Sequence, residues 1–202
     1  MSHYFHTPEG PSHPRTVHTH IWDLDLDFLS ADGVFSGARL DPGTAVLFRE
    51  TEPPSDAVRL LDLGCGFGPI AVALALTVPG AQVDAVDVNE RALDLTRLNA
   101  ERHGVADRVR VGTPGALDPA AQYDEIWSNP PIRIGKAALH DLLSTWLARL
   151  SPTGVARLVV GRNLGADSLA RWLVDAGWDV TRAASAKGYR VLEVRPGPTL
   201  GV

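Results

Sequence analysis

Residues 126–136 read IWSNPPIRIGK, and the centre of this stretch combines an amide side chain with two prolines. An apolar strand is expected to stop at Asn129-Pro130-Pro131. Proline has no backbone N–H and fixes φ, and it pushes the residue before it out of the helical region. The corner therefore keeps two hydrogen-bond acceptors, the Asn129 amide oxygen and the Pro130 carbonyl, on a stiff backbone. Such a pair can hold a group that donates two hydrogen bonds.

A second stretch that could do chemistry is the glycine-rich DLGCGFG, which follows a predicted strand and precedes a predicted helix. Its glycines, Gly64, Gly66 and Gly68, let the backbone turn sharply and approach a ligand closely. Asp62 lies at the strand end. Asp87 ends the next strand, where a carboxylate can accept hydrogen bonds from both hydroxyls of a ribose. A nicotinamide cofactor stays open on these residues alone, although its third glycine usually comes one residue later.

Other reactive residue types have simpler interpretations. Cys65, inside the glycine loop, is interpreted as a small residue in a tight turn, because no motif places a histidine to activate it. The aspartates of WDLDLDF alternate along a strand, which predicts a solvated face. The N-terminal histidines lack a Cys or carboxylate framework at ligand spacing, so no metal site is predicted.

The elements that must position these residues alternate between strand and helix from residue 57 onward. Strands are expected at 58–64, 82–88, 108–112, 123–129, 154–161, 178–184 and 188–196. Helices are expected at 69–78, 89–104, 136–150 and 165–177. This alternation predicts an α/β fold: a Rossmann-like, doubly wound, mostly parallel seven-stranded sheet. The last two strands lack an intervening helix, which predicts a C-terminal antiparallel hairpin.

Residues 1–50 are predicted to form an N-terminal arm and a β-hairpin cap, and residues 51–202 the main domain, in one compact unit. WDLDLDF has the period of two of a half-buried strand, and an Asp-Gly pair at 32–33 supplies turn chemistry. A β-hairpin extension is therefore expected over about residues 17–37. Asp41, followed by proline, predicts the N-cap of a helix.

Composition excludes some classes of protein. The 202 residues are 45% hydrophobic and 21% charged, enough to bury a core. A single cysteine permits no internal disulfide, and neither a membrane span nor a secretory signal is evident, which predicts a cytoplasmic location. The net charge of −5 argues against coating nucleic acid by bulk electrostatics. An enzyme that meets RNA through local cations remains open, and these include Arg182, Lys187 and Arg190 near the C-terminus.

DLGCGFG, together with VDVNERAL, resembles the cofactor site of class I S-adenosylmethionine-dependent methyltransferases. The residues that this resemblance assigns to cofactor binding are Asp62, Gly64, Cys65, Gly66, Gly68, Asp87, Val88, Asn89, Gly112, Thr113 and Asn129. The glycine loop would line the methionine part, Asp87 would bind the ribose, and Val88 or Asn89 would flank the adenine. These enzymes often present an acidic or amide side chain after the third strand, and here Gly112 and Thr113 would supply a backbone group or a hydroxyl instead.

NPPI resembles the [N/D/S]-P-P-[aromatic] motif of amino-group methyltransferases of this class. Their target amine is a poor nucleophile, because its lone pair is delocalised into a π system. If Asn129 Oδ1 and the Pro130 carbonyl each accept one N–H, the nitrogen can pyramidalise and direct its lone pair at the methyl carbon. Pro131 adds stiffness, so Asn129, Pro130 and Pro131 are the predicted catalytic residues.

The fourth residue of the motif is Ile132, where an aromatic ring would stack on a base with about 1–3 kcal/mol. Phe35 or Trp127 would have to supply such a ring. Arg133 and Lys136 are expected to contact phosphate, with ordinary surface charge as the alternative. The predicted substrate-binding residues are therefore Phe35, Ile132, Arg133 and Lys136.

NPPIRIGK, GVFSGARLDPGTAVLF and KGYRVLEV together resemble the small-domain methyltransferases related to 16S ribosomal RNA guanine-N2 methyltransferases, over nearly the whole chain. The resemblance implies S-adenosyl-L-methionine as cofactor, a guanine amine as target, and ribosomal RNA or a ribosomal subunit as partner. Methylation of a protein glutamine amide or of a small-molecule amine, and a non-catalytic cofactor-binding module, remain alternatives.

Overall fold

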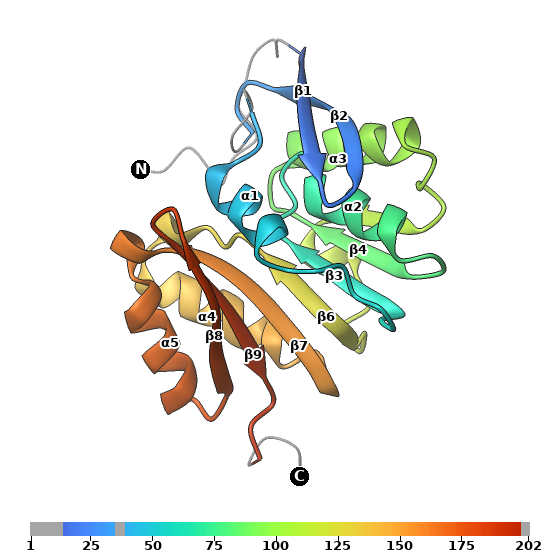
Figure 1. Cartoon of the computed structure of the whole chain (residues 1–202). Helices are drawn as coiled ribbons and strands as arrows, with labels where there is room; N and C mark the ends of the chain where they lie inside the picture. Colours follow the sequence, from blue (N-terminus) through green and yellow to red (C-terminus); the bar gives the residue numbers. More distant parts are fainter. Residues whose placement is uncertain (1–13, 35–38, 199–202) are drawn as a thin grey trace.

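The computed structural model describes residues 14–34 and 39–198. Within these ranges a hairpin, β1 (Pro14–Ile21) and β2 (Leu24–Ala31), precedes a seven-stranded sheet (Figure 1). The sheet strands are β3 (Arg59–Leu63), β4 (Gln82–Val86), β5 (Val109–Gly112), β6 (Tyr123–Ser128), β7 (Leu150–Gly161), β8 (Asp179–Ala186) and β9 (Tyr189–Arg195). The α-helices are α1 (Pro42–Arg49), α2 (Pro69–Thr77), α3 (Glu90–Arg102), α4 (Lys136–Leu147) and α5 (Ala166–Asp175). None of the described helices is long and apolar enough to cross a membrane.

The strand order is β5-β4-β3-β6-β7-β9-β8. Strands β3 to β7 pair in parallel, whereas β9 pairs antiparallel with both β7 and β8. The predicted mostly parallel sheet with a C-terminal antiparallel hairpin is therefore confirmed. The chain leaves β3 toward β4 and later returns to β6 on the other side of β3, which creates a topological switch point. The glycine loop after β3 and the Asn-Pro-Pro corner after β6 lie on either side of it.

Two apolar cores cover the two faces of the sheet. The hairpin, α1, α2 and α3 pack on one face, and α4 and α5 pack on the other (Figure 1). Seven of the nine residues of helix α2 are apolar and buried. The helix is therefore buried on nearly all of its surface. The division of the chain at residue 50 stays a prediction, and strand β2 and helix α1 share one core with α2 and α3.

The hairpin forms, but the predicted position of its turn is wrong. Its turn lies at Trp22 and Asp23, between strands that pair from Pro14 with Ala31 to Ile21 with Leu24. Trp22 adopts a left-handed φ of 50°, and its indole N–H donates to the Thr51 carbonyl at 2.8 Å. These long-range contacts of Trp22 outweigh the local turn chemistry of the Asp-Gly pair.

Asn99 of α3 joins the hairpin to the glycine loop. Its amide oxygen accepts from the Leu29 N–H at 2.7 Å, and its amide nitrogen donates to the carbonyls of Leu29, at 2.8 Å, and Phe67, at 2.7 Å. Asn99 is fully buried, so each lost bond would leave an unsatisfied polar group. One side chain thereby fixes both segments against the same helix.

Asp84 is the centre of a polar network within the sheet. Asp84 is 4% exposed, and its carboxylate accepts from Tyr123 Oη at 2.8 Å, Arg110 Nε at 3.0 Å and Arg59 Nη2 at 3.3 Å. Burial, and then the hydrogen bond to Asp84, raises the pKa of the Tyr123 phenol, which therefore acts as a donor.

Replacing Asp84 with alanine is expected to lower the free energy of unfolding by about 2–3 kcal/mol, because a buried phenol loses its acceptor and two guanidinium groups lose their counter-charge. Urea denaturation checks this prediction. The matched control is Asp94→Ala, which removes an exposed ion pair with Arg97 and is expected to cost less than about 0.5 kcal/mol. Equal stability of the two variants would contradict the structural role of the network.

Candidate functional site

The glycine loop turns back over the end of β3 with three left-handed residues. Gly64, Gly66 and Gly68 have φ values of 81°, 57° and 89°. A Cβ at Gly64 or Gly66 would meet no atom within 4 Å, whereas a Cβ at Gly68 would lie 2.8 Å from Thr96 Cγ2. Gly64 and Gly66 therefore leave open space above the backbone that a ligand can fill. Gly68 is required because the loop packs directly on α3.

A buried carboxyl group, Asp62, and a half-buried one, Asp87, lie under this loop. Asp62 Oδ2 accepts from the Ala71 N–H at 2.9 Å, and within the described part of the chain nothing donates to Asp62 Oδ1. Burial raises the pKa of Asp62 to about 8, with an opposing effect of the Ala71 hydrogen bond and a further increase from the charge of Asp87. Asp87 accepts from the N–H groups of Gly66, at 3.0 Å, and Asn89, at 2.9 Å. Burial also raises the pKa of Asp87.

Cys65 has the surroundings of a packing residue. Its side chain is buried, and Thr96 Oγ1 lies 3.5 Å from the sulfur while donating to the Gly66 carbonyl at 3.0 Å. Burial, and then the charges of Asp62 and Asp87, raise the pKa of the Cys65 thiol well above its usual value. The thiol stays protonated and is not a nucleophile.

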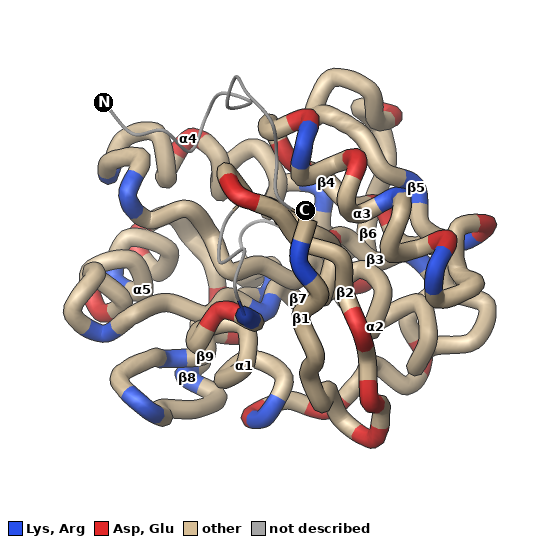
Figure 2. The backbone as a smooth tube through the Cα atoms, turned by 90° about the horizontal axis from the view of Figure 1, so that it is seen from above, with Lys and Arg blue, Asp and Glu red and all other residues tan. Residues whose placement is uncertain are grey.

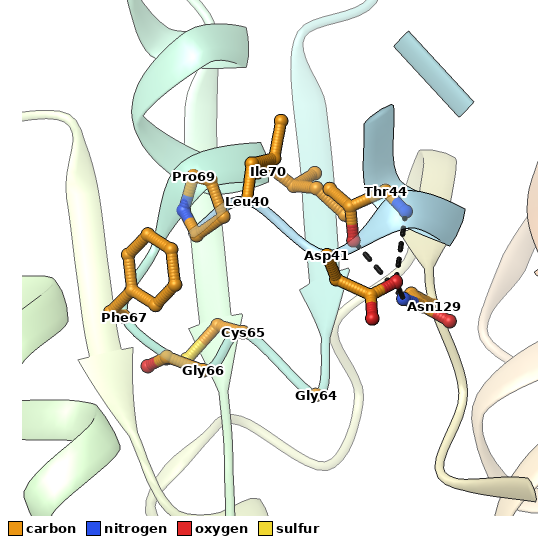
Figure 3. Close-up of a pocket in the computed structure, with 10 residues that line it drawn as sticks. All are labelled: Leu40, Asp41, Thr44, Gly64, Cys65, Gly66, Phe67, Pro69, Ile70 and Asn129. Carbon is orange, nitrogen blue, oxygen red and sulfur yellow. Dashed lines mark hydrogen bonds between the residues drawn. The ribbon is translucent and has the colours of Figure 1, made fainter. Parts of the chain in front are cut away.

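A cleft of about 350 Å³, including its open mouth, lies between the glycine loop, the starts of α1 and α2, and the end of β6 (Figure 3). Four predicted site residues line it together: Gly64, Cys65, Gly66 and Asn129. Sequence reasoning missed six further lining residues, namely Leu40, Asp41, Thr44, Phe67, Pro69 and Ile70. The segment LDPGT was predicted to start a helix and to carry part of the family resemblance, but none of its residues was predicted as a site residue, although its N-cap side chain also faces the site.

The orientation of the Asn129 amide follows from its contacts with α1. Asn129 Nδ2 donates to Asp41 Oδ1 at 2.6 Å and to Thr44 Oγ1 at 3.1 Å (Figure 3). Asp41 Oδ1 also accepts from the N–H groups of Gly43 and Thr44 and so caps the helix. Both amide hydrogens are therefore used within the fold, and the amide oxygen remains as the acceptor, since no described residue donates to it.

The two prolines shape the backbone after Asn129. Pro131 has φ −74° and ψ 74°, and the Ile132 N–H donates to the Pro130 carbonyl at 2.8 Å. This is an inverse γ-turn, whose φ the proline ring enforces. A carbonyl oxygen has two lone pairs, so Pro130 keeps one for a further donor.

The predicted substrate residues are not gathered in this cleft. Ile132 packs partly against the core on the α4 side, and Arg133 and Lys136 are exposed beyond it. Trp127 is fully buried and its indole donates to Glu125 at 2.8 Å, so the expectation that it could stack on a base is wrong. Phe35 lies outside the described residues.

The residues expected near the adenine lie at the ends of β4 and β5. Val88 is 47% exposed. The Asn89 side chain caps α3 and donates to the Gly33 carbonyl at 3.0 Å, so it is engaged within the fold. Gly112 is buried and pairs with Val86, and Thr113 follows it with partial exposure. In residues 14–34 and 39–198, no three His, Cys, Asp or Glu side chains lie close enough together to hold a metal ion.

Comparisons with known proteins identify the class. The fold superposes with a TM-score of 0.78 on the T. thermophilus 16S rRNA N2 G1207 methyltransferase (RsmC), solved in complex with AdoMet and guanosine. The two sequences are 25% identical, and the match covers 94% of this chain and 52% of that one. The protein is an S-adenosylmethionine-dependent methyltransferase. It belongs to the methyltransferase small domain family, whose model matches residues 25–193.

Two curated relatives differ in how much of their own length the match to this chain covers. The uncharacterized protein YbxB of Bacillus subtilis is 31% identical, over 95% of this chain and 96% of its own length. Ribosomal RNA small subunit methyltransferase C of Shewanella amazonensis is 33% identical over 73% of this chain. The matched region is 44% of that enzyme, so the chain resembles less than half of it.

Proposed function

We propose that the enzyme methylates an exocyclic amine of RNA, and that this amine is N2 of a guanine in ribosomal RNA. The observation that carries the proposal is the fixed orientation of Asn129, which presents an amide oxygen, and not an N–H, to a substrate. Guanine N2 has two N–H bonds to donate and a lone pair delocalised into the ring. The ribosomal RNA methyltransferases among the relatives support the choice of substrate. Action on ribosomal RNA is consistent with the predicted cytoplasmic location.

In the proposed mechanism the chain positions the amine and does not activate it with a base. Asn129 Oδ1 and the Pro130 carbonyl each accept one N–H of the target. Held in this way, the nitrogen loses conjugation with the ring and its lone pair is aimed along one direction. Preorganised acceptors of this kind need no rearrangement during the reaction, which is how they lower the barrier.

The same edge of the sheet fits the cofactor. Gly64 and Gly66 have room for a ligand against their backbone, and the buried Asp62 Oδ1 lacks a donor among the described residues. We assign the amino-acid part of S-adenosylmethionine to the loop above Asp62, the ribose to Asp87, and the adenine to the exposed Val88. The cofactor supplies a methyl group on a sulfonium, an electrophilic carbon with a good leaving group.

Cofactor binding is expected to release about one proton at pH 7. Asp62 has a pKa of about 8, so most of it is protonated at neutral pH when no cation is near. A cationic ligand favours the ionised carboxylate and lowers its pKa, so the proton leaves. Affinity is therefore expected to rise as the pH increases from about 6 to about 8 and then to level off.

Calorimetry in two buffers of different ionisation enthalpy measures this proton release. The control is Asp62→Asn, which keeps an acceptor for the Ala71 N–H and has no proton to release. Equal proton release by the wild type and the variant would show that another group is responsible and would remove Asp62 from the cofactor site.

Methyl transfer from labelled cofactor to unmodified ribosomal RNA tests the function. We expect label in RNA, recovered as N2-methylguanosine after digestion to nucleosides. Parallel reactions contain assembled small subunits, a glutamine-containing release factor and small amines. Label found only in the release factor or in the small amines would overturn the proposal. Transfer to RNA at an atom other than an exocyclic amine would overturn it as well.

A further inference from the structure

Unpaired positive charge is unevenly distributed over this acidic protein. Lys and Arg are interspersed with Asp and Glu over much of the described chain, as Figure 2 shows from above. Most arginines pair with a carboxylate or donate to a backbone carbonyl; for example, Arg182 and Arg190 both contact Asp167. Within the described residues, six exposed cations have no side-chain hydrogen bond or ion pair: Arg39, Arg102, Arg133, Lys136, Arg162 and Lys187.

Five of these six cations lie at the edge of the sheet that carries Asn129. Arg133 and Lys136 follow the Asn-Pro-Pro corner after β6, in a short 3-10 helix (Ile132–Ile134) and at the start of α4. Arg39 directly precedes Leu40 and Asp41, which line the cleft.

The remaining two continue the same edge past β7. Arg162 directly follows β7, the parallel neighbour of β6, and Lys187 lies in the turn between β8 and β9. The Arg162 N–H donates to the Gly188 carbonyl at 2.8 Å, which brings these two segments together. Because adjacent strands lie about 4.8 Å apart, the ends of β6, β7 and β9 place cations over roughly 10 Å beside the cleft.

Arg102 is the sixth of these cations, and it does not lie at the edge that carries Asn129. It lies in the last turn of α3, and a helix that returns between parallel strands ends at the opposite edge of the sheet. Elsewhere in the described chain, nearby acidic side chains neutralise most exposed cations. Five exposed cations without an acidic partner at one edge are therefore poorly explained by a need for solubility. They are well suited to phosphate groups, which bring the missing negative charge.

We propose that Arg39, Arg133, Lys136, Arg162 and Lys187 form an edge that binds the phosphate backbone of the RNA substrate next to the target guanine. This proposal rests on the proposed function and extends it from the amine to the flanking nucleotides. The net charge of −5 leaves little attraction elsewhere, so RNA is guided to the face that holds Asn129. Neither Ile132, which stands where the motif has an aromatic residue, nor the buried Trp127 can supply a stacking ring.

Salt-dependent binding of a labelled single-stranded oligoribonucleotide of mixed sequence tests the edge. Each neutralised phosphate contributes about 0.7 to the slope of log affinity against log salt concentration. Glutamine at any one of the five positions is expected to reduce that slope by about 0.7, and glutamine at all five by about 3.5. Arg102→Gln, an exposed unpaired arginine at the opposite edge, is the matched control and is expected to leave the slope unchanged.

Cofactor binding and methyl transfer to RNA are measured on the same proteins. Loss of RNA affinity in the edge variants, with cofactor binding intact and Arg102→Gln unaffected, supports the proposal. A slope that falls equally in Arg102→Gln, or that does not change in the five-position variant while the wild type still methylates RNA, overturns the edge and leaves the proposed function standing. A wild type that neither binds nor methylates RNA but modifies a protein or a small amine overturns both.

Discussion

Alanine at position 129 is expected to lower the turnover number for methyl transfer by about 10²–10³-fold, the usual effect of removing one preorganised group from a transition state. The substitution removes the amide oxygen that accepts an N–H of the target, and Pro130 alone cannot fix the direction of the lone pair. Turnover is measured at saturating RNA and cofactor. Cofactor affinity, measured by calorimetry, is expected to change by less than about tenfold, because Asp62, Asp87 and the glycine loop are untouched.

Asn163→Ala provides the matched control for this experiment. Asn163 is exposed just after β7 at the same edge of the sheet, in the short 3-10 helix Arg162–Leu164. We expect wild-type turnover from it. Near-normal turnover of Asn129→Ala would mean that the amine is held by other groups, and the catalytic assignment of the corner would then be wrong.

Serine at position 41 is expected to lower turnover by about 10–100-fold with little change in stability. Serine is a good N-cap, so α1 keeps its first turn, but its hydroxyl is too short to replace Asp41 Oδ1 at 2.6 Å from Asn129 Nδ2. With one donor released, the Asn129 amide can rotate and present an N–H to the substrate. Asp41 is thus a positioning residue, and the loss is expected in turnover and not in the Michaelis constant for RNA.

Two conservative variants separate positioning from folding. Asp41→Asn keeps an oxygen acceptor and an N-cap and is expected to recover most of the activity, whereas Thr44→Val removes the second acceptor and is expected to lower turnover severalfold. The side-chain amide resonances of Asn129 report the hydrogen bonds without any substrate. Equal losses in Asp41→Ser and Asp41→Asn, or unchanged amide resonances in Asp41→Ser, would contradict the positioning role.

Much of the fold could be predicted because its determinants are local. Strand and helix periodicity placed all seven sheet strands, and the missing helix between the last two gave the antiparallel hairpin. Glycine positions predicted the loop, since Gly64, Gly66 and Gly68 all need a left-handed backbone that few other residues adopt. The position of Asp87 could also be predicted from local sequence, because it comes at the end of a strand whose boundary was clear.

The remaining features depend on contacts between distant segments. Asp41 and Asn129 are separated by 88 residues, and the sequence identified Asp41 only as a helix cap. The hairpin turn lies at Trp22 because of a bond to Thr51, 29 residues away. Trp127 was available for stacking on sequence grounds, yet strand alternation turns it toward the core and Glu125 binds its indole. Each of these features is a tertiary contact that overrides or reuses a local preference.

The three hydrogen bonds of Asn99 make the hairpin and the glycine loop one cooperative unit. When the hairpin opens, Asn99 loses its partners on Leu29, and the same movement loosens its hold on Phe67 in the loop. Stability is therefore shared between the hairpin and the loop to which we assign the cofactor. A ligand that orders the loop is therefore expected to slow opening of the hairpin, and amide hydrogens in β2 are expected to exchange more slowly when the cleft is filled.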